Sequence, residues 1–481
     1  MIKATTQDAY QLFHDGVRAL SDVEANGIKI DRNYLRWCID DTKNRVGRLR
    51  KELWDSEQGK LWRKVFGKKT NLGSGDQLAV ILFDHLGHKE LHPKTRSGKR
   101  CTNAAALEMI DDPLVGKTQK IASLEKMLST YLRNIRIELD RDGFIHPFFN
   151  LHLVDTFRSQ SEAPNFQNMP NRDPELMRLV RRCFLPRSAD HMIVEVDIGG
   201  AEVSVAACYH KDPTMLDYLQ DDTKDMHRDM AAECYLVDPE DVSKPARHSA
   251  KNRFVFPQFY GAAFFTCGAS LWDNISTMNL TDASGVSLKE RLSSNGINEL
   301  GEVKKDKHGK TKATPGSFQE HIQKVCDSFW NDRFPVYTAW KESWYRQYME
   351  KGHMDSLTGF RYSGDLVRRK IINYPVQGSA FHCLLWSLIR ANRWTKGRKT
   401  KIIGQIHDSI VADVHISEMD EFMSFIHHLM TVKLAQTWKW IITPIKVEAE
   451  ASEPGRAWCD KFPWEEGVWG NKPEVFGGAW S

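Results

Sequence analysis

The sequence predicts an α+β fold in which a small antiparallel sheet lies among long helices. Residues 400–414 are two runs rich in β-branched residues, separated by a short polar segment, which is typical of a hairpin. Residues 191–197 alternate between two faces, as a strand does. Apolar residues at helical spacing predict long helices over 7–24, 115–139 and 381–389.

The composition limits the class of protein. The chain has 481 residues, 41% of them apolar, which is enough for two or three domains or subdomains with buried cores. Its 67 basic and 63 acidic residues nearly balance, so local patches rather than the net charge would attract a polyanion. Nine cysteines without a Cys-x-x-Cys pair fit neither a zinc site nor a secreted disulfide framework. No signal segment and no run of about eighteen apolar residues is present, so we expect a cytoplasmic protein without a membrane span.

Aspartates end the two predicted strand segments. Asp197 closes the strand over 191–197, and Asp408 lies at the tip of the hairpin. An aspartate in a turn often has only a structural role. Two aspartates at strand ends can also meet at one edge of an antiparallel sheet and hold two divalent cations ~4 Å apart. The pair alone is compatible with polymerases, nucleases and phosphatases alike.

A cluster of phosphate-binding residues lies between these strands in the sequence. Arg247 and Lys251 are four residues apart and share a helical face, as a triphosphate clamp would require, and His227 adds a third group. The aromatic residues after Lys251 would equally suit a helix packed in a core. Glu202 lies in the first turn of an apolar helix, where the helix dipole alone would favour a carboxylate.

Two further stretches suit a nucleic acid. Residues 156–170 are dense in amide, hydroxyl and guanidinium groups and contain two prolines. They predict an ordered loop whose polar groups contact either nucleic-acid sugars and bases or each other. The helix over 115–139 is basic and includes Lys126. Its charges suit a phosphate backbone or a solvated face.

In this order, the landmarks resemble the motifs of family A DNA polymerases, the group that contains the bacterial repair polymerase and many phage replicative polymerases. The resemblance covers about residues 5–460. The family's Asp-Tyr-Ser-Gln-Ile-Glu-Leu-Arg is similar to Asp-Ile-Gly-Gly-Ala-Glu-Val-Ser at 197–204, and its His-Asp-Glu is similar to His-Asp-Ser at 407–409. Residues 156–170 are similar to its Thr-Gly-Arg-Leu-Ser-Ser-x-x-Pro-Asn-Leu-Gln-Asn-Ile-Pro motif, and 373–380 to its Asn-x-Pro-x-Gln-Gly-x-Ala motif.

The resemblance implies a right-hand polymerase fold with an antiparallel palm sheet, helical fingers and a helical thumb. The implied domains are a palm-associated N-terminal helix at 1–35, the thumb at 36–150, the first part of the palm at 151–220, the fingers at 221–355, and the second part of the palm with a C-terminal tail at 356–481. Residues 5–35 already resemble the start of the polymerase domain. We therefore expect no attached 3′-5′ exonuclease and no proofreading by the chain itself.

The implied reaction is a two-metal nucleotidyl transfer in which a primer 3′-hydroxyl attacks an incoming dNTP. Asp197, Asp408 and the Ile198 carbonyl are the expected ligands of two Mg²⁺ ions, with Mn²⁺ as an alternative. Glu202 is expected to select deoxynucleotides by crowding a ribose 2′-hydroxyl. Ser409 stands where the family has glutamate and cannot supply that anion, so metal affinity or the position of the primer end is expected to differ.

The nucleotide clamp matches the family motif except for one extra residue. The family has Arg-x-x-x-Lys-x-x-x-Phe/Tyr-x-x-x-Tyr-Gly, and both halves are intact here, as Arg247 with Lys251 and Phe256 with Tyr260. One residue inserted in a regular helix rotates all later side chains by about 100°. We therefore expect a wide turn or π-bulge between the halves, to which Pro257 would contribute. The implied dNTP-binding residues are Glu202, His227, Arg247, Phe256, Tyr260 and Lys251, the last also catalytic.

Contacts to DNA are implied along the same motifs. Arg158 is expected to reach the primer-terminal pair through the minor groove, where acceptors common to all base pairs allow a check of shape without sequence preference. Asn373 and Gln377 are one helical turn apart, but Pro375 indicates that only Gln377 is inside the helix. The implied set is Lys126, Arg158, Asn165, Gln167, Asn373, Gln377, Gln405 and His407.

Two other functions stay open at this point. Losses from the family motifs at Gly200, Ser204 and Ser409 suggest a catalytically weak or silent DNA-binding homologue. A single-subunit RNA polymerase of related fold is the other alternative, although Glu202 argues against it. The expected partners are primer-template DNA and dNTPs. We further expect a monomer that acts in phage DNA replication in a bacterial host, with a separate exonuclease, clamp or processivity factor.

Overall fold

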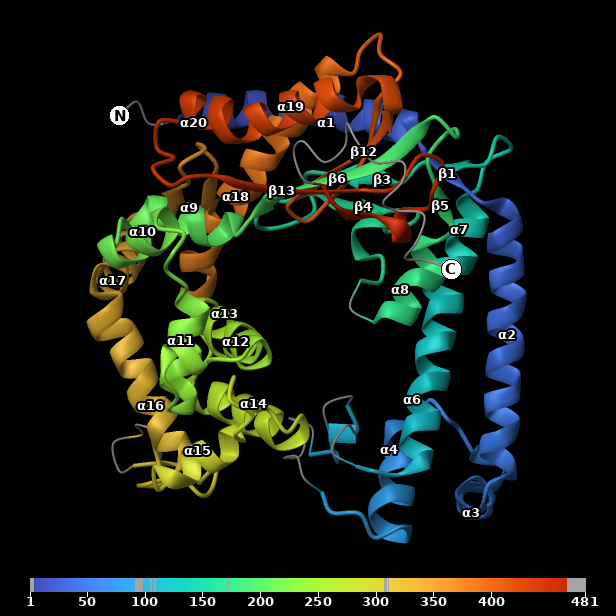
Figure 1. The fold of residues 1–481 in the computed structure, drawn as a ribbon, viewed down its shortest axis with the longest axis vertical. Helices are drawn as coiled ribbons and strands as arrows, with labels where there is room; N and C mark the ends of the chain where they lie inside the picture. Colours follow the sequence, from blue (N-terminus) through green and yellow to red (C-terminus); the bar gives the residue numbers. More distant parts are fainter. Residues whose placement is uncertain are drawn as a thin grey trace.

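A computed structural model describes residues 4–90, 98–103, 106–107, 110–171, 173–306, 309 and 311–464 of the protein. It contains a sheet region and two helical arms that project from the same side of the sheet region (Figure 1). The N-terminal arm contains α2 (Arg32–Asp55), α3 (Glu57–Phe66), α4 (Gly75–Ala79), α6 (Pro113–Lys126) and α7 (Arg133–Glu138). The middle arm contains α11 (Met226–Tyr235), α12 (Lys244–Ala250), α13 (Phe256–Phe259), α14 (Phe264–Thr277), α15 (Leu288–Ser294), α16 (Phe318–Ser328) and α17 (Pro335–Lys351).

The sheet region is built on five antiparallel strands in the order β11-β12-β6-β13-β14. These strands are β11 (Lys401–Ile406), β12 (Ser409–His415), β6 (His191–Gly199), β13 (Lys446–Ala451) and β14 (Phe462–Pro463). The predicted hairpin and the predicted strand are therefore neighbours. Their register sets Asp197 opposite Ser409, and the Ile198 N–H donates to the Asp408 carbonyl at 3.1 Å. The α+β class is confirmed, and the two aspartates lie at the same end of the sheet.

Helices cover the sheet and join it to one extended core. α1 (Thr6–Asn26) begins with a capping box between Thr5 and Asp8, and it packs against β11 and α18 (Arg368–Trp394). A second core lies in the middle arm, with Phe254, Phe318 and Phe334 fully buried. A third, smaller cluster contains Ala9, Phe360 and Ile371.

The remaining elements are short. They are α8 (Pro174–Arg181), α9 (Ala201–His210), α10 (Pro213–Gln220), α19 (Met419–His428), α20 (Leu434–Thr437), a three-stranded sheet of β1 (Ile28–Ile30), β2 (Phe144–Ile145) and β5 (Phe184–Leu185), and the pairs β3 (Phe148–Asn150) with β4 (Gln160–Glu162), β7 (Val303–Lys305) with β8 (Thr311–Ala313) and β9 (His353–Asp355) with β10 (Arg361–Ser363). Within the described ranges, no helix is long and apolar enough to cross a membrane.

α18 extends further towards its N-terminus than the sequence predicts. It includes Pro375, so Asn373 and Gln377 both lie inside the helix, and the expectation that only Gln377 would be helical was wrong. Proline has no N–H, so the carbonyl one turn earlier, that of Ile371, loses its usual helical partner. The Trp344 indole N–H of α17 donates to this carbonyl at 3.2 Å. A side chain from a neighbouring helix thus replaces the missing backbone bond.

The extra residue of the clamp motif is absorbed by a π-helical turn. α12 ends at Ala250, the π turn spans Lys251–Val255, and α13 begins at Phe256. A single π turn takes up one residue more than an α turn does. The helix after it therefore returns to the orientation that the shorter motif would have. The expected distortion between Lys251 and Phe256 is confirmed.

Candidate active site

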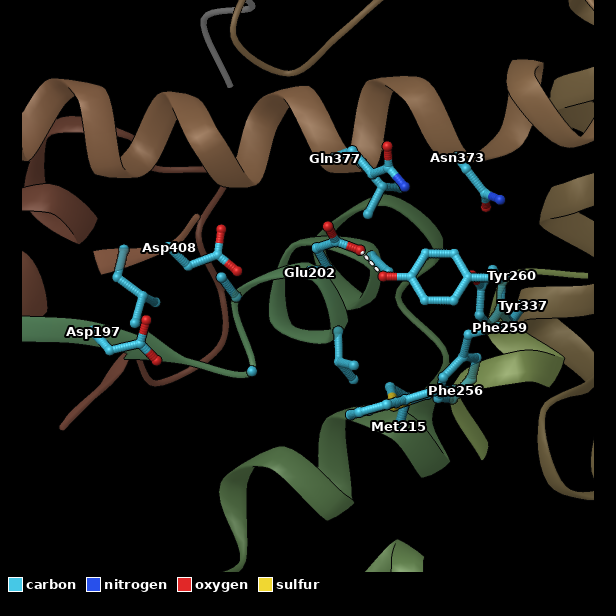
Figure 2. Close-up of a pocket in the computed structure, with 16 residues that line it drawn as sticks. Asp197, Glu202, Met215, Phe256, Phe259, Tyr260, Tyr337, Asn373, Gln377 and Asp408 are labelled. Atoms are coloured by element: carbon cyan, nitrogen blue, oxygen red, sulfur yellow. Dashed lines mark hydrogen bonds between the residues drawn. The ribbon is translucent and has the colours of Figure 1, made fainter. Parts of the chain in front are cut away.

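A cavity of about 270 Å³ opens where β6 ends beside the β11–β12 turn. In Figure 2 the carboxylates of Asp197 and Asp408 lie on one side, and the aromatic rings of the middle arm lie on the other. The predicted site residues that line the cavity are Asp197, Ile198, Glu202, Phe256, Tyr260, Asn373, Gln377 and Asp408. Segments from three distant parts of the chain thus meet around one space.

Strand register brings the two aspartates into a common electrostatic environment. Burial, then the charges of Asp408, Glu195 and Glu448, raise the pKa of Asp197 to about 6. Burial also raises the pKa of Asp408, although the Arg158 guanidinium opposes this shift. Both carboxylates are therefore held in a place that disfavours their negative charge, and a bound cation would stabilise them.

The donor atoms at this end of the cavity fit hard divalent cations. Carboxylate and carbonyl oxygens are the ligands that Mg²⁺ and Mn²⁺ accept, and Asp197, Asp408 and Ile198 supply them. Among the residues that the structure describes, no group of three or more His, Cys, Asp or Glu side chains is already arranged around a metal position. With Asp197 and Asp408 as the carboxylate ligands, the site suits Mg²⁺ that also binds water and phosphate oxygens.

Arg158 connects the two acidic positions of the cavity. Its guanidinium donates to Glu202 Oε1 at 2.8 Å and to Asp408 Oδ1 at 3.3 Å. The other oxygen of Glu202 accepts from the Tyr260 hydroxyl at 2.6 Å (Figure 2). Gly200, with φ of 64°, begins α9 in the left-handed region that favours glycine and leads into the turn that carries Glu202. A chain of polar contacts therefore runs from the sheet region to the middle arm.

The clamp residues lie beside the aromatic wall. Lys251 Nζ is 5.3 Å from the centre of the Phe256 ring, and within the described residues Lys251 forms no ion pair. Arg247 is paired with Asp225. Burial, then the charges of Lys251 and Arg247, lower the pKa of His227 to about 4. His227 is thus neutral at pH 7 in this structure, and its imidazole can form a hydrogen bond with a phosphate.

Two amide side chains that the sequence predicts as DNA contacts, Gln167 and Gln405, bind one another. Gln405 Oε1 accepts from Ser159 Oγ and from Gln167 Nε2, each at 2.5 Å. Gln405 Nε2 donates to the His407 carbonyl at 2.6 Å. Gln167 thus bonds to Ser159 of its own loop and to Gln405 on β11, and the contact of either glutamine with DNA stays a prediction. The same bonds fix the strand that leads to Asp408.

Two other predicted DNA contacts lie apart from the cavity. The Asn165 side chain accepts from the Asn168 N–H at 3.2 Å and so begins a short helical turn. Lys126 is exposed at the end of α6 in the N-terminal arm. Neither residue lines the cavity. Their contact with DNA stays a prediction.

Sequence reasoning missed two carboxylates close to Asp197. Glu195 precedes Asp197 by two positions on β6, so its place on the same face of the strand was a signal that could have identified it. Glu448 lies opposite Asp197 on β13. No local pattern marks Glu448, because it joins the site only through strand pairing. The apolar wall of Met215, Tyr337 and Val376 was missed for the same reason.

Comparison with known proteins places this site in a family. The profile described as DNA polymerase family A matches residues 42–280 and 320–459. DNA polymerase I of Lactococcus lactis subsp. lactis is 25% identical over 461 residues, which are 92% of this chain and 44% of the relative. The thermostable DNA polymerase I of Thermus aquaticus is 26% identical over 408 residues, which are 82% of this chain and 42% of the relative. The chain thus spans less than half the length of these relatives.

A solved structure shares the fold. The POL domain of Pol1 from M. smegmatis, in complex with DNA primer-template and dNTP, superposes with a TM-score of 0.69 at 21% identity, covering 92% of this chain and 70% of that chain. At this identity the likeness concerns the fold. The family profile, in contrast, matches well over half of the sequence. The chain therefore belongs to DNA polymerase family A.

Proposed function

We propose that this protein is a template-directed DNA polymerase that adds dNTPs to a primer 3′-hydroxyl. The observation that supports this most is the meeting of Asp197 and Asp408 at one end of a cavity whose other wall includes Phe256 and Tyr260 of the clamp motif. Family membership favours nucleotidyl transfer over the nuclease and phosphatase alternatives. The structural neighbour, which was solved with primer-template and dNTP, is consistent with the same choice.

In this proposal the sheet region is the palm, the N-terminal arm is the thumb, and the middle arm is the fingers. Both arms project from the side of the sheet region on which duplex DNA would lie (Figure 1). The predicted role of Lys126 would then be a phosphate contact from the thumb. Phage replication, a separate exonuclease and a processivity factor stay predictions from the resemblance.

The chain's own residues suggest how the reaction would be prepared. Two Mg²⁺ ions held by Asp197, Asp408 and the Ile198 carbonyl would lower the pKa of the 3′-hydroxyl and neutralise charge on the leaving pyrophosphate. Arg158 contacts one oxygen of Asp408 at 3.3 Å, which leaves the other oxygen for a cation. Lys251, which has no ion pair among the described residues, is free to bind the triphosphate.

The position of Glu202 supports selection of deoxynucleotides. Its carboxylate is held from both sides, by Arg158 at 2.8 Å and by Tyr260 at 2.6 Å. A carboxylate fixed in this way cannot move aside for a ribose 2′-hydroxyl without breaking charge-assisted hydrogen bonds. This favours a DNA polymerase over the RNA polymerase alternative.

Primer extension tests the proposal directly. With each dNTP supplied alone, we expect only the nucleotide complementary to the template to be added, with synthesis lost in EDTA and restored by Mg²⁺ or Mn²⁺. Parallel reactions with rNTPs should give far less product, and equal use of both would favour the RNA polymerase. Tight binding of primer-template without any incorporation would favour the silent DNA-binding homologue.

A further inference from the structure

A partly buried carboxylate lies beside the hairpin that carries Asp408. Glu195 is on β6, and its side chain is only 16% exposed. Its Oε1 is 3.1 Å from the hydroxyl of Ser409, the residue that follows Asp408. The same hydroxyl is 2.9 Å from the Ile406 carbonyl, so its proton can serve either acceptor. Position 409, on β12, thus has a hydroxyl where the family A motif has glutamate. In this chain a glutamate, Glu195, lies instead on the neighbouring strand β6.

The C-terminal segment holds this carboxylate in place. Glu195 Oε2 accepts from the Trp458 indole N–H at 3.1 Å and forms an ion pair with Lys461. Trp458 is 1% exposed, and Lys461 also pairs with Glu450 on β13. A carboxylate with charged and neutral donors on one oxygen has a fixed orientation. Its second oxygen is therefore aimed at Ser409.

Glu195 is connected to both expected metal ligands. It lies two positions before Asp197 on the same strand face, and it contacts the residue next to Asp408. Asp197 also borders a second cavity, of about 510 Å³, on the side that Glu195, Ser409 and Lys461 line. On this side of the site, Glu195 therefore contacts Ser409, and Ser409 is the residue next to Asp408 at the hairpin tip.

We propose that Glu195 is a positioning residue that takes over the task of the acid absent at position 409, fixing the Asp408 turn through Ser409. The inference rests on the proposed function, because it concerns the same metal site. It predicts that the acid and the hydroxyl can be exchanged between the strands. In the double variant E195S/S409E, the carboxylate would again lie between the two strands, beside the cavity that Ser409 and Lys461 both line.

The test compares Glu195→Ser, Ser409→Glu and the double variant. We expect Glu195→Ser to lower kcat at least tenfold with the KM for dNTP changed less than threefold, because substrate contacts are untouched. Ser409→Glu alone should also lower kcat, since it adds a third carboxylate to the two, Glu195 and Glu450, that already pair with Lys461. The double variant should recover kcat to within about threefold of the native protein. Glu450→Gln is the matched control: it shares Lys461 but has no contact with Ser409, so kcat should not change.

Mn²⁺ binding gives a readout that does not depend on turnover. Electron paramagnetic resonance of the protein with dideoxy-terminated primer-template should show weaker Mn²⁺ binding for Glu195→Ser, by at least fivefold, and recovery in the double variant. Glu195→Gln serves if the serine variant does not fold: its single acceptor oxygen can face either Ser409 or the donors Trp458 and Lys461, so it should show a smaller loss in the same direction. Thermal unfolding monitors structure in every variant.

The outcomes separate this inference from the proposed function. Absence of dNTP incorporation by the native protein would refute the polymerase, while the Mn²⁺ titrations would still decide the role of Glu195. An active native protein with unchanged kcat and Mn²⁺ binding in Glu195→Ser would overturn the inference. So would a double variant that regains thermal stability without regaining kcat, because Glu195 would then be only structural.

Discussion

The sheet region and the middle arm each form one side of the cavity, but they position their residues in different ways. Asp197 and Asp408 are brought together by the pairing of strands distant in sequence, where a shift of one residue would turn every side chain to the opposite face. The clamp from Arg247 to Tyr260 lies along one helix, and the π turn absorbs an extra residue within it. The acids therefore depend on exact strand register, whereas the clamp tolerates a change of length.

The largest expected effect comes from removing one acid without changing the register. Asp408→Asn keeps the shape of the side chain, and it should lower dNTP incorporation by at least about a thousandfold, because a charge that acts on the transition state is lost. Single-nucleotide extension measures the rate, and fluorescence anisotropy in EDTA should show unchanged affinity for primer-template. Asp413→Asn is the comparison, since Asp413 is buried on the same strand but pairs with Arg187 far from the turn. It should lower thermal stability and leave synthesis intact.

A second prediction concerns the folding stability that is lost because strand pairing places Asp197 close to other carboxylates. In the folded protein the pKa of Asp197 is raised from 3.8 to about 6, so its charged form opposes folding. The loss of stability begins as pH rises past the unfolded value and is complete above the folded value. Asp197→Asn should therefore raise the free energy of unfolding at pH 8 in EDTA by up to about 3 kcal/mol, and far less at pH 4. Chemical denaturation at both pH values checks this, and an equal effect at both would contradict it.

A third prediction tests the tolerance of the clamp. Asn252 is exposed in the π turn, and its side chain hydrogen bonds only with His248 among the described residues. Deleting Asn252 should convert the π turn to a regular helix with the aromatic residues still facing the cavity. We expect the rate of dNTP incorporation to stay within about tenfold of that of the native protein, because removing the extra residue restores the helical spacing of the shorter family motif. Deleting the buried Ala412 from β12 should instead abolish folding or activity.

Circular dichroism and primer extension distinguish these two deletions. If loss of Asn252 were as damaging as loss of Ala412, the π turn would have a task of its own, such as orienting Lys251. The comparison between the regions would then fail, because the helix would depend on its length as strictly as the sheet does.

The sequence predicted the parts of the site that follow from local pattern. Strand ends marked Asp197 and Asp408, and motif spacing together with Pro257 predicted the π turn. Prediction from the sequence failed where a residue is positioned or satisfied by a group from a distant part of the chain. Pro375 is accommodated because Trp344 supplies a donor from another helix. Glu448 joins the site only through the pairing of β13 with β6, which no linear spacing reveals.

The smallest expected effect concerns the contact between the two regions. Burial, then Glu202, raise the pKa of Tyr260, so its hydroxyl remains a donor to Glu202 at neutral pH. Tyr260→Phe removes this bond and keeps the ring, and a hydrogen bond to a carboxylate contributes about 1.5 kcal/mol. Glu202 is still held by Arg158, so the preference for dNTP over rNTP should weaken only a few-fold.

Glu202→Ala is the matched comparison, and it should relax the preference at least tenfold further because the carboxylate itself is removed. The measurement is the ratio of kcat/KM for dNTP to that for rNTP in both variants. If Tyr260→Phe relaxed the ratio as much as Glu202→Ala does, Glu202 would depend on the middle arm for its position. Selection of the sugar would then require the two regions to be in contact, whereas a small effect would show that Arg158 and the sheet region hold Glu202 by themselves.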